Sequence, residues 1–172
     1  SFASHVHWSS HGTFPVIIEE VFRKHNPAVK FESVNEGGMS TSRALERYMH
    51  DVEALSPGLT IIVLAFKEEK DYPALEEICR RLNGRALFFD ALAAGAHNLP
   101  LLRPDAAKLR RIADDTGASL VKVADMLDNH PLLPTFMSLD GIHMMPPYHK
   151  VMGVELAKAL VGLCGAKPGR RA

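Results

Sequence analysis

The chain has 172 residues, of which 47% are hydrophobic, and its formal net charge is zero. This length and composition suit one globular domain spanning residues 1–172 around a single core. A zero net charge argues against a nucleic-acid or membrane-surface partner held by electrostatics, and no apolar run is long enough for a membrane span.

Helical and strand-like patterns alternate along the chain. Apolar residues at helical spacing, such as Ile17, Val21 and Phe22, predict helices, whereas continuous runs such as LTIIVLAF predict strands buried on both faces. After a polar loop at 1–13, the predicted order is helix 14–24, strand 29–34, helix 41–55, strand 59–66, helix 71–82, strand 85–92, helix 104–116, strand 118–123 and helix 148–163, with 126–133 ambiguous.

That alternation indicates an α/β fold with a central parallel sheet covered by helices on both faces, a three-layer α/β/α sandwich. In such sheets the functional site lies at the carboxyl ends of the strands. The loops expected there are 35–40, the segments after Phe66 and Leu92, and the loop 140–143. Ser1 would join them if a strand precedes it.

The two cysteines, Cys79 and Cys164, fall in predicted helices far apart in the sequence. Buried free thiols are the favoured interpretation, and a disulfide is the alternative. The chain starts at Ser1 without a methionine or a signal-type segment, so we expect a fragment, or a chain that lacks its first residues. This says little about compartment, with the cytoplasm slightly favoured, and the pattern does not indicate an oligomeric state.

A carboxylate and an imidazole stand close together in the loop before the last helix. Asp140 and His143 are three positions apart, and Pro146 and Pro147 end the loop. Such a carboxylate can hold the histidine Nδ1 and leave Nε2 free to take a proton from a nucleophile. A surface aspartate beside a histidine with ordinary hydrogen bonds is the alternative.

Histidines near the start of the chain raise the question of a metal. His5 and His7 could chelate from an extended segment, with His11 as a further ligand. A polar loop with chance histidines explains them more simply, and we expect no metal.

Glycines follow the strand predicted at 29–34. In the segment 35–42, Gly37 and Gly38 come before a predicted helix, where backbone N–H groups can face a developing oxyanion. Alone, this pattern is an ordinary glycine-containing turn between a strand and a helix.

Together these segments resemble the SGNH (GDSL-type) hydrolase family, whose fold is a flavodoxin-like α/β/α sandwich. Asp140-Gly-Ile-His143 resembles its Asp-x-x-His block, and VNEGGMSTSRALERYMHDV resembles the block around its oxyanion-hole glycine. The opening Ser1-Phe2 is similar to the end of its Gly-Asp-Ser block, which implies that the first strand and its Gly-Asp are missing ahead of Ser1. The resemblance implies that Ser1 is the nucleophile and that Gly38, or Ser40 if one counts from Asn35, stands at the oxyanion position.

One block departs from the family pattern. The family carries Gly-x-Asn-Asp after the strand that is predicted here at 59–66, and its asparagine side chain is an oxyanion donor. This chain continues AFKEEKD. Either the asparagine is lost, or a segment is absent between Phe66 and Lys67. We favour the second explanation, which predicts a Cα–Cα distance there well above ~3.8 Å.

The implied chemistry is cleavage of an ester, thioester or acetyl ester through an acyl-serine intermediate. The implied catalytic residues are Ser1, Asp140 and His143; the implied oxyanion donors are the Ser1 and Gly38 N–H groups; and His5, His7 and Trp8 would line the substrate pocket. This route needs no metal and no organic cofactor. The substrate would be a small-molecule ester or an acylated carbohydrate. The alternatives are a carbohydrate O-acyltransferase and a non-catalytic binding domain on the same fold.

Overall fold

The computed structural model describes residues 14–34, 40–63, 68–90, 104–122 and 146–165. Within these ranges three parallel strands form a sheet in the order β1 (Thr60–Ile61), β2 (Ala86–Phe89), β3 (Ser119–Val121). Ile61 lies opposite Leu87, and Leu87 lies opposite Ser119. Strands that are adjacent along the chain are thus adjacent in the sheet, each joined to the next through a helix.

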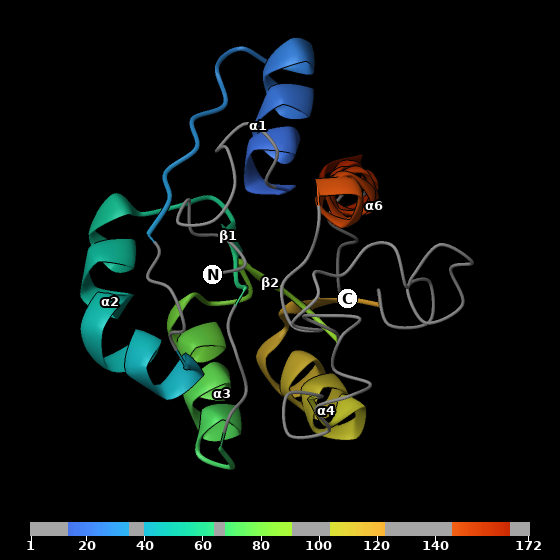
Figure 1. Cartoon of the computed structure of the whole chain (residues 1–172). Coiled ribbons are helices and arrows are strands. Elements are labelled where there is room, and N and C mark those ends of the chain that lie inside the picture. Colours follow the sequence, from blue (N-terminus) through green and yellow to red (C-terminus); the bar gives the residue numbers. More distant parts are fainter. Residues whose placement is uncertain (1–13, 35–39, 64–67, 91–103, 123–145, 166–172) are drawn as a thin grey trace, which may run out of the picture.

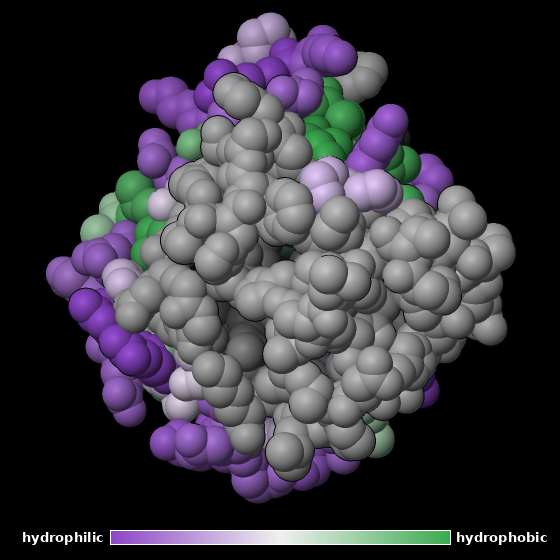
Figure 2. Space-filling view, viewed as in Figure 1, coloured by the Kyte–Doolittle hydropathy of each residue, from purple (hydrophilic) through white to green (hydrophobic). Residues whose placement is uncertain are grey.

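Helices cover both faces of this sheet, which confirms the three-layer α/β/α architecture (Figure 1). On one side lie α2 (Thr41–Leu55), α3 (Asp71–Arg81) and α4 (Ala106–Thr116), and on the other lie α1 (Phe14–His25) and α6 (Pro146–Gly165). The outer sides of α1, α2 and α3 are mainly hydrophilic (Figure 2). The amphipathic patterns of the sequence are therefore realised with the apolar sides toward the sheet.

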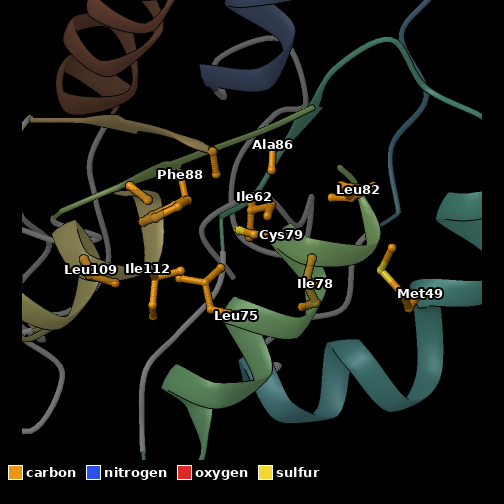
Figure 3. Packing of buried hydrophobic residues seen from close by; sticks show 12 residues of the cluster. Met49, Ile62, Leu75, Ile78, Cys79, Leu82, Ala86, Phe88, Leu109 and Ile112 are labelled. Carbon is orange, nitrogen blue, oxygen red and sulfur yellow. The ribbon is translucent and has the colours of Figure 1, made fainter. Parts of the chain in front are cut away.

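Successive side chains of the central strand β2 alternate between the two hydrophobic cores. Ala86 and Phe88 are buried in the layer of α3 and α4 (Figure 3), whereas Leu87 and Phe89 are buried in the layer of α1 and α6. Successive side chains of a strand point to opposite faces, so four consecutive apolar residues are needed when both faces are covered. This is why the run around β2 carries no polar alternation.

The helices α1 and α6 pack closely against each other. The backbone of Gly153 in α6 lies so near Ile17 of α1 that an added Cβ would be 2.7 Å from the Ile17 Cγ2 atom. A glycine lets the two helix backbones approach in this way. The same layer holds Ile18, Met152 and Leu156, all buried.

The strand predicted at 29–34 is wrong. In the structure these residues form neither strand nor helix, and they run as a strap between α1 and α2 (Figure 1). The alternation in the sequence is still real, because Val29 and Phe31 are half-buried while Lys30 and Glu32 are exposed. Phe31 packs its ring edge against Phe22 of α1, at 6.1 Å between centroids. The apolar side of this segment therefore packs against helix α1, and the segment does not pair with a strand.

Other boundaries also moved. Within the described residues the three remaining strands are shorter than predicted, and the last helix begins at Pro146, so the two prolines open that helix rather than end the loop. Proline suits a first helical turn because its missing N–H would have no helical partner there. Cys79 is buried and free, as expected, whereas the side chain of Cys164 is outside the described residues.

Candidate active-site edge

The carboxyl ends of the three strands face the same edge as the starts of three helices. Leu55 ends α2 and leads directly to the start of β1, and the ends of α3 and α4 lead in the same way to β2 and β3. These helices therefore run antiparallel to the strands, with their N-termini at the carboxyl edge. Helix N-termini carry unpaired N–H groups and a partial positive charge, which favours negative charge at this edge.

On the other face, α1 and α6 begin side by side. The Phe14 N–H donates to His149 Nδ1 at 3.4 Å, and the two rings stack with centroids 5.9 Å apart. His149 is only 3% exposed. The first N–H of α1, which has no partner within its own helix, is thus capped by a side chain from the first turn of α6.

Burial decides the charge of this histidine. It lowers the pKa of His149 from 6.5 to about 4, so the imidazole is neutral at physiological pH. A neutral ring can accept the Phe14 hydrogen bond at Nδ1, and its proton then sits on Nε2. The link between α1 and α6 therefore depends on His149 staying uncharged.

A buried carboxylate joins α2 to the start of α3. Asp71, the first residue of α3, is fully buried, and its Oδ1 accepts the Ser42 N–H of α2 at 2.8 Å. Its Oδ2 accepts the Glu68 N–H at 3.0 Å. One carboxylate thus holds two backbone segments that both reach the carboxyl edge.

A second set of contacts continues from α3 to α4. The Tyr72 hydroxyl accepts the Asp105 N–H at 2.7 Å, immediately before α4. Lys108 of α4 lies 4.8 Å from the Tyr72 ring centroid and also pairs with Glu69. The N-termini of α2, α3 and α4 are therefore linked to one another along the edge.

The residues that the sequence predicts for catalysis fall outside the described ranges. These are Ser1, Gly38, Asp140 and His143, together with the pocket candidates His5, His7 and Trp8 and the Phe66–Lys67 junction. Ser40, the alternative oxyanion residue, is described: it is the N-cap of α2, and its hydroxyl accepts the Arg43 N–H at 3.4 Å. The structure therefore describes the helix starts that flank these segments.

Two described residues were missed from the sequence. Asp71 looks like a routine acidic residue at a helix start, and His149 looks like one more polar residue on an exposed turn. Asp71 has one near partner, the Glu68 N–H three residues before it, but its Ser42 partner lies 29 residues away and the Phe14 partner of His149 lies 135 residues away. Nothing in the local pattern could have indicated these two long-range contacts.

Two further observations bear on other kinds of site. Within the described ranges no cluster of three or more His, Cys, Asp or Glu residues could hold a metal, and no helix there is long and apolar enough for a membrane span.

An open depression of about 500 Å³ lies at the C-terminal end of α1, lined by Arg23, Pro27, Val29, Lys30, Phe31 and Glu32. It is a full helix length from the Phe14–His149 contact.

Comparison with known proteins gives similarity in structure but not in sequence. No family model and no curated protein matches the chain. The structure is similar to the psychrotrophic esterase EstA from Pseudoalteromonas sp. (TM-score 0.76, 11% identity, 95% of this chain and 94% of that one). It is also similar to a lipase/acylhydrolase from Enterococcus faecalis (0.71, 12%, 94% and 91%) and to TesA (0.72, 13%, 95% and 95%). The chain thus shares the fold of these three proteins, and this fold agrees with the α/β/α architecture that the sequence resemblance implied.

Proposed function

We propose that this chain is a serine hydrolase that cleaves a small ester through an acyl-serine intermediate. Its fold is that of esterases and acylhydrolases over nearly the whole chain. We take residues 1–172 as one domain. Because a fold hosts many functions, the chemistry depends on the residues carried at its site.

The observation that carries the proposal is the shared edge of strand ends and helix starts. The segment that carries Gly38 leads into α2, which begins at that edge, and the segment that carries Asp140 and His143 follows β3 and leads into α6. Ser1 lies ahead of α1, and α1 and α6 begin side by side through Phe14 and His149. Topology therefore supports a meeting of these three segments at one end of the sheet.

In the proposed reaction, Ser1 Oγ attacks the ester carbonyl while His143 Nε2 takes its proton. Asp140 holds His143 through Nδ1 and stabilises the imidazolium. The tetrahedral intermediate collapses as His143 protonates the leaving alcohol, which leaves an acyl-serine. Water, deprotonated by His143, then attacks that ester, and Ser1 leaves with a proton returned from His143.

The negative oxygen of each intermediate needs N–H donors that are already in place. We propose the Ser1 and Gly38 backbone N–H groups for this role, with an asparagine of the family type as a third donor from a segment after Phe66. The positive ends of the helices at this edge add to the same stabilisation. His5, His7 and Trp8 would line the pocket for the acyl or alcohol part.

The test is turnover of p-nitrophenyl acetate by the full-length protein and its variants. Ser1→Ala and His143→Ala should each lower kcat by a factor of ~1,000 or more, because both act in one unit. His50→Ala is the matched control, since His50 is exposed on α2. A fluorophosphonate probe should add its mass to the wild type and not to Ser1→Ala.

The same experiment separates the alternatives. Transfer of acetate to an added carbohydrate, in preference to water, would indicate an O-acyltransferase with an acylated carbohydrate as its natural substrate or product. Equal turnover by wild type, Ser1→Ala and His143→Ala would refute the hydrolase proposal. A non-catalytic binding domain would then be the better interpretation.

A further inference from the structure

We propose that Asp71 is a positioning residue for the acyl transfer described above, a role that rests on the proposed function. Its carboxylate fixes the first turn of α2 to the start of α3, and so holds the backbone that leads to Gly38. Asp71 touches no reacting atom in this proposal. It acts through the oxyanion donors rather than on the substrate.

The geometry at Asp71 is that of a brace between two chain segments. Ser42 is the second residue of α2, so its N–H belongs to the first turn, where helical N–H groups have no partner inside the helix. Glu68 stands three residues before Asp71, at the start of the chain described after the 64–67 segment. The two carboxylate oxygens bind these N–H groups at 2.8 and 3.0 Å, one each.

Burial makes this brace stiff. Asp71 is 0% exposed, so water cannot replace a lost N–H partner without rearrangement of the surrounding side chains. The carboxylate also lies at the N-terminal ends of both α2 and α3, where their dipoles favour its negative charge. Fixed charge-assisted hydrogen bonds of this kind set the position of a backbone more firmly than neutral ones.

Both braced segments adjoin the proposed oxyanion donors along the chain. Gly38 is two residues before Ser40, the N-cap of α2, and the family's asparagine block would come just before Glu68. An oxyanion hole depends on donors held within a few tenths of an ångström of the developing charge. Loss of the brace should therefore lower kcat, whereas KM, which reports ground-state binding, should change little.

The chain offers two matched controls. Asp105 caps α4 with a carboxylate that accepts the Ala107 and Lys108 N–H groups at 2.9 and 3.2 Å, so Asp105→Ala removes two comparable bonds at a neighbouring helix start. Glu53 pairs with Arg81 at the opposite ends of α2 and α3, so Glu53→Gln loosens the same two helices away from the edge. Neither change touches the segments next to Gly38 or Glu68.

The experiment combines steady-state kinetics on p-nitrophenyl acetate with amide hydrogen exchange. Asp71→Asn keeps one acceptor oxygen and Asp71→Ala keeps none, so kcat should fall by about 10-fold and about 100-fold, with KM within about 2-fold. The Ser42 and Glu68 amides should lose exchange protection in the same order. Asp105→Ala and Glu53→Gln should leave kcat within about 2-fold of the wild type.

The outcomes are distinct. If Asp71→Asn and Asp105→Ala lower kcat equally, or if Asp71→Asn loses amide protection at unchanged kcat, Asp71 is not a positioning residue. If Asp71→Ala fails to fold, Asp71→Asn alone decides the question by the same measurements. Equal turnover by wild type and Ser1→Ala would overturn the proposed function, and with it this role for Asp71. The exchange data would still show whether Asp71 holds the Ser42 and Glu68 amides.

Discussion

Replacing His149 by asparagine should remove much of the acid sensitivity of this protein. Asparagine can place a carbonyl oxygen near the position of the imidazole Nδ1, so it can still accept the Phe14 N–H, and it does not titrate. In the wild type, protonation of His149 would turn Nδ1 into a donor that faces another donor, within a site that is 3% exposed. The fold therefore requires the neutral ring.

The size of the effect follows from the two pKa values. In the unfolded chain His149 takes up a proton near pH 6.5, whereas in the folded protein it does so only at about 4. Between these two pH values only the unfolded state gains that proton. The contribution of His149 to the free energy of unfolding is therefore fully present above pH 6.5 and is lost as the pH falls to 4. At about 1.4 kcal/mol for each pH unit, the loss is about 3 kcal/mol.

Urea unfolding from pH 4 to 7.5 measures this loss, and an NMR titration of the His149 ring measures its pKa. The wild-type free energy of unfolding should fall by about 3 kcal/mol more than that of His149→Asn across this range. His50→Asn, on the exposed side of α2, should behave as the wild type does. Parallel losses in wild type and His149→Asn, or a folded-state pKa near 6.5, would refute the reasoning.

The remaining predictions concern packing and thiol chemistry. Gly153→Ala should lower the free energy of unfolding by about 1–3 kcal/mol in thermal or urea unfolding, because the new Cβ would overlap Ile17. Gly162→Ala, where nothing lies within 4 Å, should instead raise it by about 0.5–1 kcal/mol through helix propensity, and a loss equal to that of Gly153→Ala would contradict the packing explanation. In a Cys164→Ser background, Cys79 should react with a thiol reagent only on unfolding, since burial raises its pKa to about 12; fast labelling of the native protein would show that the core opens there.

The layer architecture could be predicted because its causes are local. The short apolar run at Ala86–Phe89 fits a strand covered on both sides, and the 3.6-residue spacing in the helical segments fixes which side of each helix is apolar. Hydrophobic periodicity therefore determined the elements and their faces. Periodicity does not determine which element packs against each face, as the segment 29–34 shows: it alternates like a strand but packs against helix α1. The same alternation serves a strand or an extended segment packed on a helix, and only the three-dimensional neighbours decide between them.

The candidate site divides along the same line. Short-range motifs predicted the proposed chemistry, because an Asp-x-x-His pair and a glycine turn can be recognised within a few residues. The bonds that would position that chemistry join residues far apart in the chain, as between Asp71 and Ser42 or between His149 and Phe14. A single sequence holds no signal for such pairs, since an aspartate that holds a helix and an aspartate in solvent look the same.

The His149–Phe14 and Asp71–Ser42 hydrogen bonds differ in the charge that the acceptor side chain carries. His149 must stay neutral to accept the Phe14 N–H, and burial ensures this. Asp71 is suited to the opposite state, because two helix N-termini favour a carboxylate that carries charge. One face of the sheet is thus tied by a neutral acceptor and the other by a charged one. Acid should weaken the His149 link, because protonation turns Nδ1 from an acceptor into a donor. The start of α1 should therefore loosen as the pH falls toward 4, and amide exchange at Phe14 should report it.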